Sequence, residues 1–129
     1  MDRVTSPRND DECIEQAIVS KGLNAPRVTP ADVANEIEIE RYFTAAEGIH
    51  GSNIAADNPI GQIPYSEHEL LTFCVLTLKN GFTVTGESAC ASPENFDADI
   101  GRRVARANAV QKIWTLLGFR LKDALKQQG

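Results

Sequence analysis

The strongest constraint on the fold of this chain is an apolar run that ends in a tight-turn signal. Residues 70–78, LLTFCVLTL, combine leucine, aromatic, β-branched and threonine side chains in the manner of a strand. The pair Asn80-Gly81 follows closely, and it favours a two-residue hairpin turn because both residues tolerate positive φ. The sequence therefore predicts an antiparallel β-hairpin formed by about 70–78 and 82–90.

The expected turn also fixes how the two strands should pair. With a two-residue loop, Thr77 faces Val84 and Cys74 faces Glu87. Both faces of the first strand are partly apolar in this register. We therefore expect helices to cover one face of the hairpin and a second subunit to cover part of the other.

Helices are predicted on both sides of the hairpin. Apolar residues recur at helical spacing over 11–21, and Gly22 ends that short helix. A longer helix is predicted over 97–117, with a bend or break at Gly118 and a final helix over 119–126. The expected buried stripe of the long helix consists of Ile100, Val104, Ala107, Val110 or Gln111, and Trp114.

A second N-terminal helix is predicted to begin at the segment TPAD, residues 29–32. Thr29 can cap the helix, Pro30 fits its first turn, and Asp32 occupies the capping-box position. Residues 36–40 alternate as a strand would, but the capping signal favours a helix that runs to about Glu47. Residues 48–64 are rich in Gly, Asn and Pro and are expected to form a loop that folds over a site or reaches a neighbouring subunit.

The chain length and composition fit one domain of the α+β class. The 129 residues are 42% hydrophobic and 24% charged, which suffices for a core without disulfides. Residues 1–10 are expected to be a flexible arm. Residues 11–129 should form a single α+β domain, in which the hairpin packs against the long C-terminal helix and one or two N-terminal helices.

Several classes of function are disfavoured by the sequence. It contains neither an apolar run of membrane-spanning length nor a signal-peptide core, so we expect a location in the cytoplasm. The three cysteines form no CxxC pair, and neither His50 nor His68 has a ligand-type partner at helical spacing, which disfavours a metal site. No nucleophile–base pair or glycine-rich phosphate loop is evident. We therefore expect no catalytic residues, no cofactor and no enzymatic activity.

Positive charge is concentrated near the C-terminus. Residues 100–129 carry 7 Lys/Arg and 1 Asp/Glu, whereas the rest of the chain is acidic and the net charge is −5. Arg102, Arg103 and Arg106 lie close together on the long helix and could bind phosphate oxygens. The alternative is a basic face that is solvated or packs near the acidic segments of the same chain. The basic field is too small to favour DNA.

Other polar residues complete the candidate site, each with a structural alternative. Glu87 could accept hydrogen bonds from sugar hydroxyls or an amine, or it could be a buried carboxylate held by Arg102 or Arg106. Asn108 could contact a ligand or hydrogen-bond the hairpin. The candidate ligand-binding residues are Tyr42, His50, Glu87, Ser88, Asn95, Arg102, Arg103, Arg106 and Asn108.

Spaced residues across most of the chain resemble one family of small phage proteins. They comprise VTPADV at 28–33, YFTAA at 42–46, LKNGFTVTGESAC at 78–90, PENFD at 93–97, IGR at 100–102, Ala105, NA at 108–109, KIW at 112–114, Leu116 and GF at 118–119. Together these resemble the phage gp forty-nine/gp sixty-six family over about residues 28–121. The chain departs from the family pattern at Thr115, where proline is expected.

The resemblance implies an accessory protein of a tailed phage, and by analogy a protein that counters host defence. The leading hypothesis is a homo-oligomer, a dimer or larger, that sequesters a small anionic, nucleotide-derived signal in the host cytoplasm. The alternative is an acidic inhibitor that binds a host defence protein or nucleic-acid enzyme. A hydrolase of a signal nucleotide and a DNA-binding protein rank below both, and no membrane partner is expected.

Overall fold

The computed structural model describes residues 10–57 and 65–129. The chain divides into two compact units, one formed by residues 37–113 and the other by the residues up to Glu36 together with 114–129. The larger unit contains the sheet. Except for Asp10, the predicted flexible arm lies outside the described residues.

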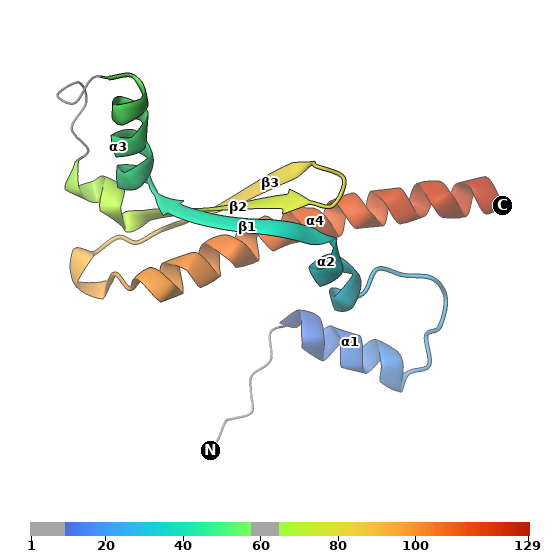
Figure 1. Cartoon of the computed structure of the whole chain (residues 1–129). Coiled ribbons are helices and arrows are strands. Elements are labelled where there is room, and N and C mark those ends of the chain that lie inside the picture. The colour runs from blue at the N-terminus through green and yellow to red at the C-terminus, as the bar shows by residue number, and fades with distance from the viewer. Residues whose placement is uncertain (1–9, 58–64) are drawn as a thin grey trace, which may run out of the picture. The chain divides into compact units, whose positions relative to one another are not determined.

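A three-stranded antiparallel sheet forms the centre of the larger unit (Figure 1). Its strands are β1 (Ile37–Thr44), β2 (Leu71–Leu78) and β3 (Thr83–Ala89), in the order β1-β2-β3. One face packs against the helix α4, and alternate residues of β2 are buried there. The α+β class and the predicted hairpin are confirmed, and the sheet gains a strand that the sequence analysis did not assign.

The added strand corrects the predicted helix over 30–47. The helix α2 ends at Glu36, and β1 begins at the next residue and pairs with β2. Pairing residues 37–44 with the apolar strand β2 is more favourable than continuing the helix α2 through them. The alternating pattern therefore decides the structure of this segment, and the capping signal at Thr29 decides only where α2 begins. On the face away from α4, which we call the open face, Phe43 stacks on Phe73 with ring centroids 5.4 Å apart.

The predicted hairpin register is wrong by one residue. The loop has three residues rather than two, and Leu78 N donates to Phe82 O at 2.8 Å. Gly81 has φ +90°, whereas Asn80 does not have positive φ, and its Oδ1 accepts a bond from Phe82 N. This is the pattern of a three-residue turn with a glycine bulge. A one-residue shift moves every side chain of the return strand to the opposite face, so Cys74 faces Gly86.

The segment predicted as a long loop over 48–64 is largely helical where it is described. The helix α3 (Ala45–Ala55) begins directly after β1 (Figure 1). Thr44 and Glu47 form its capping box, with Glu47 N donating to Thr44 Oγ1 and Thr44 N donating to Glu47 Oε1. Residues 58–64 lie outside the described residues. Short 3-10 helices at Ser66–Leu70 and Pro93–Asn95 precede β2 and α4.

The helix α4 (Ala98–Gln128) is continuous, so the predicted break at Gly118 is wrong. Its buried stripe is also displaced from the predicted one. The residues with little or no exposure are Gly101, Ala105, Ala109, Ile113 and Leu117, while Ile100 is 58% and Val104 is 44% exposed. Small side chains face the sheet because the helix backbone lies very close to it. A Cβ atom at Gly86 would overlap the carbonyl oxygen of Ala105 and the amide nitrogen of Ala109.

The smaller unit contains α1 (Asp10–Ser20), α2 (Pro30–Glu36) and the end of α4. Gly22, at φ +67°, ends α1 as predicted, and the bonds from Gly22 N to Val19 O and from Leu23 N to Ile18 O are those of a Schellman motif. The predicted capping box of α2 is confirmed, since Asp32 N donates to Thr29 Oγ1 and Thr29 N donates to Asp32 Oδ2.

Three polar contacts connect separate segments of the smaller unit. Arg27 bonds both carboxylate oxygens of Glu15, Trp114 Nε1 donates to Asp11 Oδ2 at 3.2 Å, and Arg120 pairs with Glu36 at 2.9 Å.

Replacing Gly86 with alanine should destabilise the protein by more than about 2 kcal/mol, because overpacking of this kind forces backbone to shift. Gly118→Ala is the matched control. Its added Cβ meets open space within a helix, so it should stabilise by roughly 0.5–1 kcal/mol. Urea denaturation of both variants measures the two effects, and equal midpoints would contradict the proposed close contact.

Candidate functional site

A connected polar cluster joins β1 to α4 in the larger unit. Arg106 donates from Nε to Glu40 Oε1 at 3.1 Å and from Nη2 to Glu40 Oε2 at 3.2 Å. The Tyr42 hydroxyl donates to Glu40 Oε1 at 2.8 Å and also faces the thiol of Cys74. We call Glu40, Tyr42, Cys74 and Arg106 the Glu40 cluster.

Strand alternation and helix position together assemble this cluster. Glu40 and Tyr42 are two residues apart in β1, so their side chains lie on the same face of the sheet. Tyr42 pairs across the sheet with Cys74, which is fully buried beneath α4. Arg106 follows the buried Ala105, so its side chain leaves α4 on the side of β1. We call this side of the helix, with Arg102 and Arg106, its β1 flank.

The environment fixes the charge states of the cluster. Hydrogen bonding from Arg106, aided by Tyr42, lowers the pKa of the Glu40 carboxyl. Burial, followed by the bond to Glu40, raises the pKa of Tyr42 well above its usual range. Burial also raises the pKa of the Cys74 thiol. At neutral pH, Glu40 is therefore a carboxylate, while the phenol and the thiol stay protonated, which suits binding better than nucleophilic attack.

The three candidate arginines lie in different environments. Arg106 is fixed by Glu40, and its side chain is 40% exposed. Arg102 lies one helical turn earlier on the β1 flank, is exposed, and has no carboxylate partner within 10–57 and 65–129. Arg103 points more directly into solvent and pairs with Asp99 at 2.9 Å. Arg102 and Arg106 are therefore the two that can act together.

The remaining candidate residues do not join them. Asn108 Nδ2 donates to the carbonyl oxygen of Glu87 at 2.8 Å, which is the structural one of the two roles that the sequence left open for it. Glu87 is exposed on the open face, and the carboxylate that pairs with Arg106 is Glu40 instead. Ser88 alternates with Glu87 and lies on the α4 face of the sheet.

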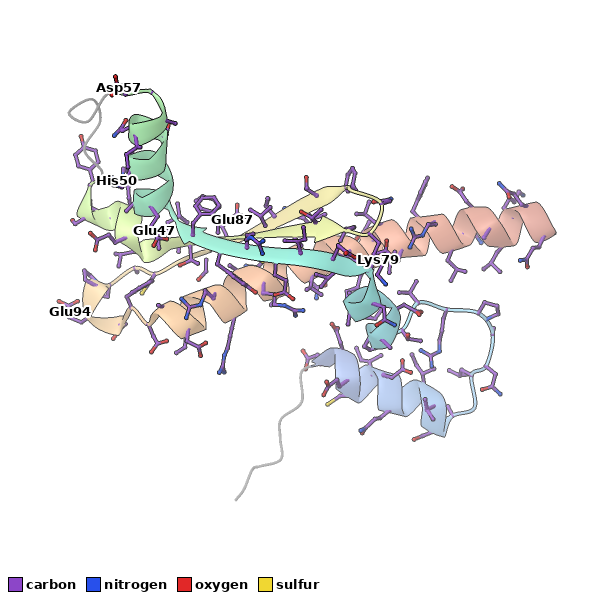
Figure 2. The ribbon with its side chains drawn as sticks, viewed as in Figure 1. Glu47, His50, Asp57, Lys79, Glu87 and Glu94 are labelled. Atoms are coloured by element: carbon purple, nitrogen blue, oxygen red, sulfur yellow. The ribbon has the colours of Figure 1, made fainter. Side chains whose placement is uncertain are left out.

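Two further candidates lie on elements that contribute nothing to the Glu40 cluster. His50 lies on α3, which Figure 2 shows rising from the end of β1, and Asn95 lies in the 3-10 helix before α4. Neither Glu40 nor Cys74 was among the site residues predicted from the sequence. The alternation over 36–40 was the signal that could have identified Glu40, because it places Glu40 on a strand face.

The described part of the chain, residues 10–57 and 65–129, has neither a metal-binding cluster nor a membrane-spanning helix. No group of three or more His, Cys, Asp or Glu residues there is placed to hold a metal ion. No helix among those residues is both long enough and apolar enough to cross a membrane.

The fold and the Glu40 cluster define a small α+β protein with a polar site where β1 meets α4. Residues 28–125 match the family described as Phage protein (N4 Gp49/phage Sf6 gene 66) family. The chain therefore belongs to this family of phage proteins, and the resemblance noted in its sequence is confirmed. No curated protein and no solved structure gives a significant match.

The Glu40–Arg106 pair should make stability depend on pH. Folding lowers the pKa of Glu40 below its ordinary value of 4.5. The pair therefore stabilises the fold fully above pH 4.5. This stabilisation is lost as the pH falls through the pKa that Glu40 has in the folded protein. Glu40→Gln should therefore cost about 1 kcal/mol or less at pH 7, since the pair is partly exposed, and almost nothing in strong acid. Thermal melts of both proteins across this range test the expectation. A difference that grew on acidification would contradict it.

Proposed function

We propose that this phage protein acts by binding, and that it sequesters a small nucleotide-derived signal molecule as a homo-oligomer in the host cytoplasm. Membership of a phage protein family supports an accessory role. Sequestering such a signal would counter a host defence. The observation that carries the proposal is the arginine pair on the β1 flank, in which Glu40 fixes one guanidinium and the other is free of carboxylates among the described residues.

Two guanidinium groups one turn apart suit a small phosphorylated ligand. The planar fork of arginine matches phosphate oxygens, and a side chain already held in place loses less conformational entropy on binding. Glu40 neutralises the positive charge of Arg106, so the net positive charge of the pair comes from Arg102. The nearby Tyr42 hydroxyl adds a polar group, and its ring adds an apolar surface.

A small anion fits better than a polyanion. The chain has a net charge of −5, and the arginine pair, Arg102 and Arg106, occupies a single turn in the first half of α4. A nucleic acid would require a larger basic field to neutralise several phosphates. The protonated states of Tyr42 and Cys74 favour binding over turnover, because neither group is poised as a nucleophile.

A thermal-shift panel of cyclic nucleotides, dinucleotides and ADP-ribose derivatives tests the proposal. A true ligand at 100 times its Kd should stabilise the protein by about 2.7 kcal/mol, a rise of several degrees in Tm. Purified protein from infected, defence-active cells should also release a nucleotide on boiling. No shift with any compound, together with no released nucleotide, would count decisively against sequestration.

The variant Arg102→Ala should weaken binding of any nucleotide found in this way by roughly 10- to 100-fold, because a charge-assisted hydrogen bond contributes about 1.5–3 kcal/mol. Lys122→Ala is the control, since it removes one positive charge from the same helix in its later half and should leave affinity within about twofold. Isothermal titration calorimetry measures both. Equal losses in the two variants would show that net charge alone attracts the ligand.

The second candidate is an acidic inhibitor of a host defence protein or nucleic-acid enzyme. Exposed carboxylates on several elements favour it, among them Glu38, Glu67, Glu87 and Glu94. Such a surface can mimic the phosphates that a nucleic-acid enzyme recognises. A stoichiometric host protein in a pull-down, released by salt and absent with charge-reversed carboxylates, would favour this function over nucleotide sequestration.

A further inference from the structure

The outer edge of β3 carries backbone groups that point away from the sheet. Leu78 N donates to Phe82 O at 2.8 Å, and Cys90 N donates to Leu70 O at 3.0 Å. Bonded pairs alternate along an antiparallel ladder, so the even-numbered residues of β3 bond β2. The amide and carbonyl groups of the odd-numbered residues, Thr83, Thr85, Glu87 and Ala89, therefore point outward.

One of these outward groups already has a partner within the same chain. The side chain of Asn108 donates to the Glu87 carbonyl, which retains its second lone pair. Thr83 and Thr85 keep both an outward donor and an outward acceptor, with no bond to either among the described residues. Both are exposed.

The two edges of the sheet differ in protection. The register shifts between Ile37 and Ile39 in β1, and that strand carries the charged residues Glu38, Glu40 and Arg41. Bulges and charges of this kind discourage pairing with another chain. In contrast, β3 pairs regularly over its whole length, contains neither proline nor lysine, and has Glu87 as its only charged residue.

An uncharged flank of α4 adjoins this unprotected edge. Asn108 reaches the β3 edge, so the side of α4 that carries it faces outward beside β3; we call it the β3 flank. One turn away on that flank lies Val104, and next to it lie Ile100 and Gln111. All four are uncharged and exposed. The sequence predicted Ile100 and Val104 to be buried, with Gln111 as an alternative to Val110 in the same stripe.

We propose that β3 pairs antiparallel with β3 of a second copy about a two-fold axis at Thr85, giving a continuous six-stranded sheet. The same axis places both α4 helices on one side of that sheet, antiparallel and flank to flank. Because α4 lies against Gly86 of β3, the two helices meet through Val104, Asn108 and Gln111. This interface specifies the homo-oligomer of the proposed function and uses none of the arginine pair.

Charge favours a second copy as the occupant of this edge. The acidic segments of two copies repel each other, whereas β3 and the β3 flank carry Glu87 as their only charged residue. In a register centred on Thr85, Glu87 faces Thr83 of the second copy rather than another carboxylate, so no like charges meet. The outward groups of Thr85 bond those of the same residue in the second copy.

Thr85→Pro tests the pairing directly. The amide of Thr85 points outward, so proline there leaves the bonds to β2 intact but removes a donor that the second copy needs. Light scattering after size exclusion, over a concentration series, should give twice 14.1 kDa for the native protein and one chain mass for Thr85→Pro. Thr85→Val, which keeps the amide, is the matched control and should remain dimeric.

A second variant guards against a folding defect. Val104→Glu places charge on the β3 flank and should also give the monomer, whereas Arg103→Glu, on a different side of α4, should leave the dimer intact. Circular dichroism confirms that each variant is folded. A native protein that is monomeric throughout, or a dimer that survives both Thr85→Pro and Val104→Glu, would overturn this interface.

The dimer and the nucleotide proposal fail separately. Nucleotide binding by a monomeric native protein would refute the interface and leave sequestration standing. A dimer that binds no nucleotide would refute sequestration and leave the interface standing.

Discussion

The larger unit depends on how closely α4 approaches the sheet. Gly86 has no side chain, and Ala105 and Ala109 present only methyl groups, so the helix backbone rests almost directly on β3. Close approach replaces bulky core packing by many short contacts between backbones and small side chains. It also brings the long side chains that leave α4 on either side, Arg106 and Asn108, within reach of β1 and β3.

This contact explains which parts of the fold could be predicted from the sequence. The hairpin, the long helix and both helix-capping signals near Gly22 and Thr29 are local, and local patterns encode them. The buried stripe of α4 is not local. Hydrophobicity pointed to Ile100 and Val104, but the sheet selects small residues one position away, and only the three-dimensional contact reveals that preference.

The strand β1 and the hairpin turn were missed for different reasons. Residues 36–40 alternate as a strand does, but the strong helix start at Thr29 favoured a helix in the prediction. The pairing of this segment with β2, which makes it a strand, is a long-range contact that local sequence does not reveal. At the turn, Asn80-Gly81 favours two kinds of loop, and the choice between them moves the return strand by one residue. The candidate site followed these errors, because Glu40 became visible only as a strand residue. Arg106 and Tyr42 were both among the predicted site residues, and the structure brings both to Glu40.

The order of the strands in the chain has a consequence for how the sheet assembles. A three-residue turn joins β2 to β3, whereas residues 45–70 separate β1 from β2. Closing a longer loop costs more chain entropy, so the hairpin can form early and β1 joins it only when the intervening segment has been drawn in. We therefore expect the Glu40–Arg106 pair to form late in folding, so that mutations there accelerate unfolding and leave the rate of folding nearly unchanged.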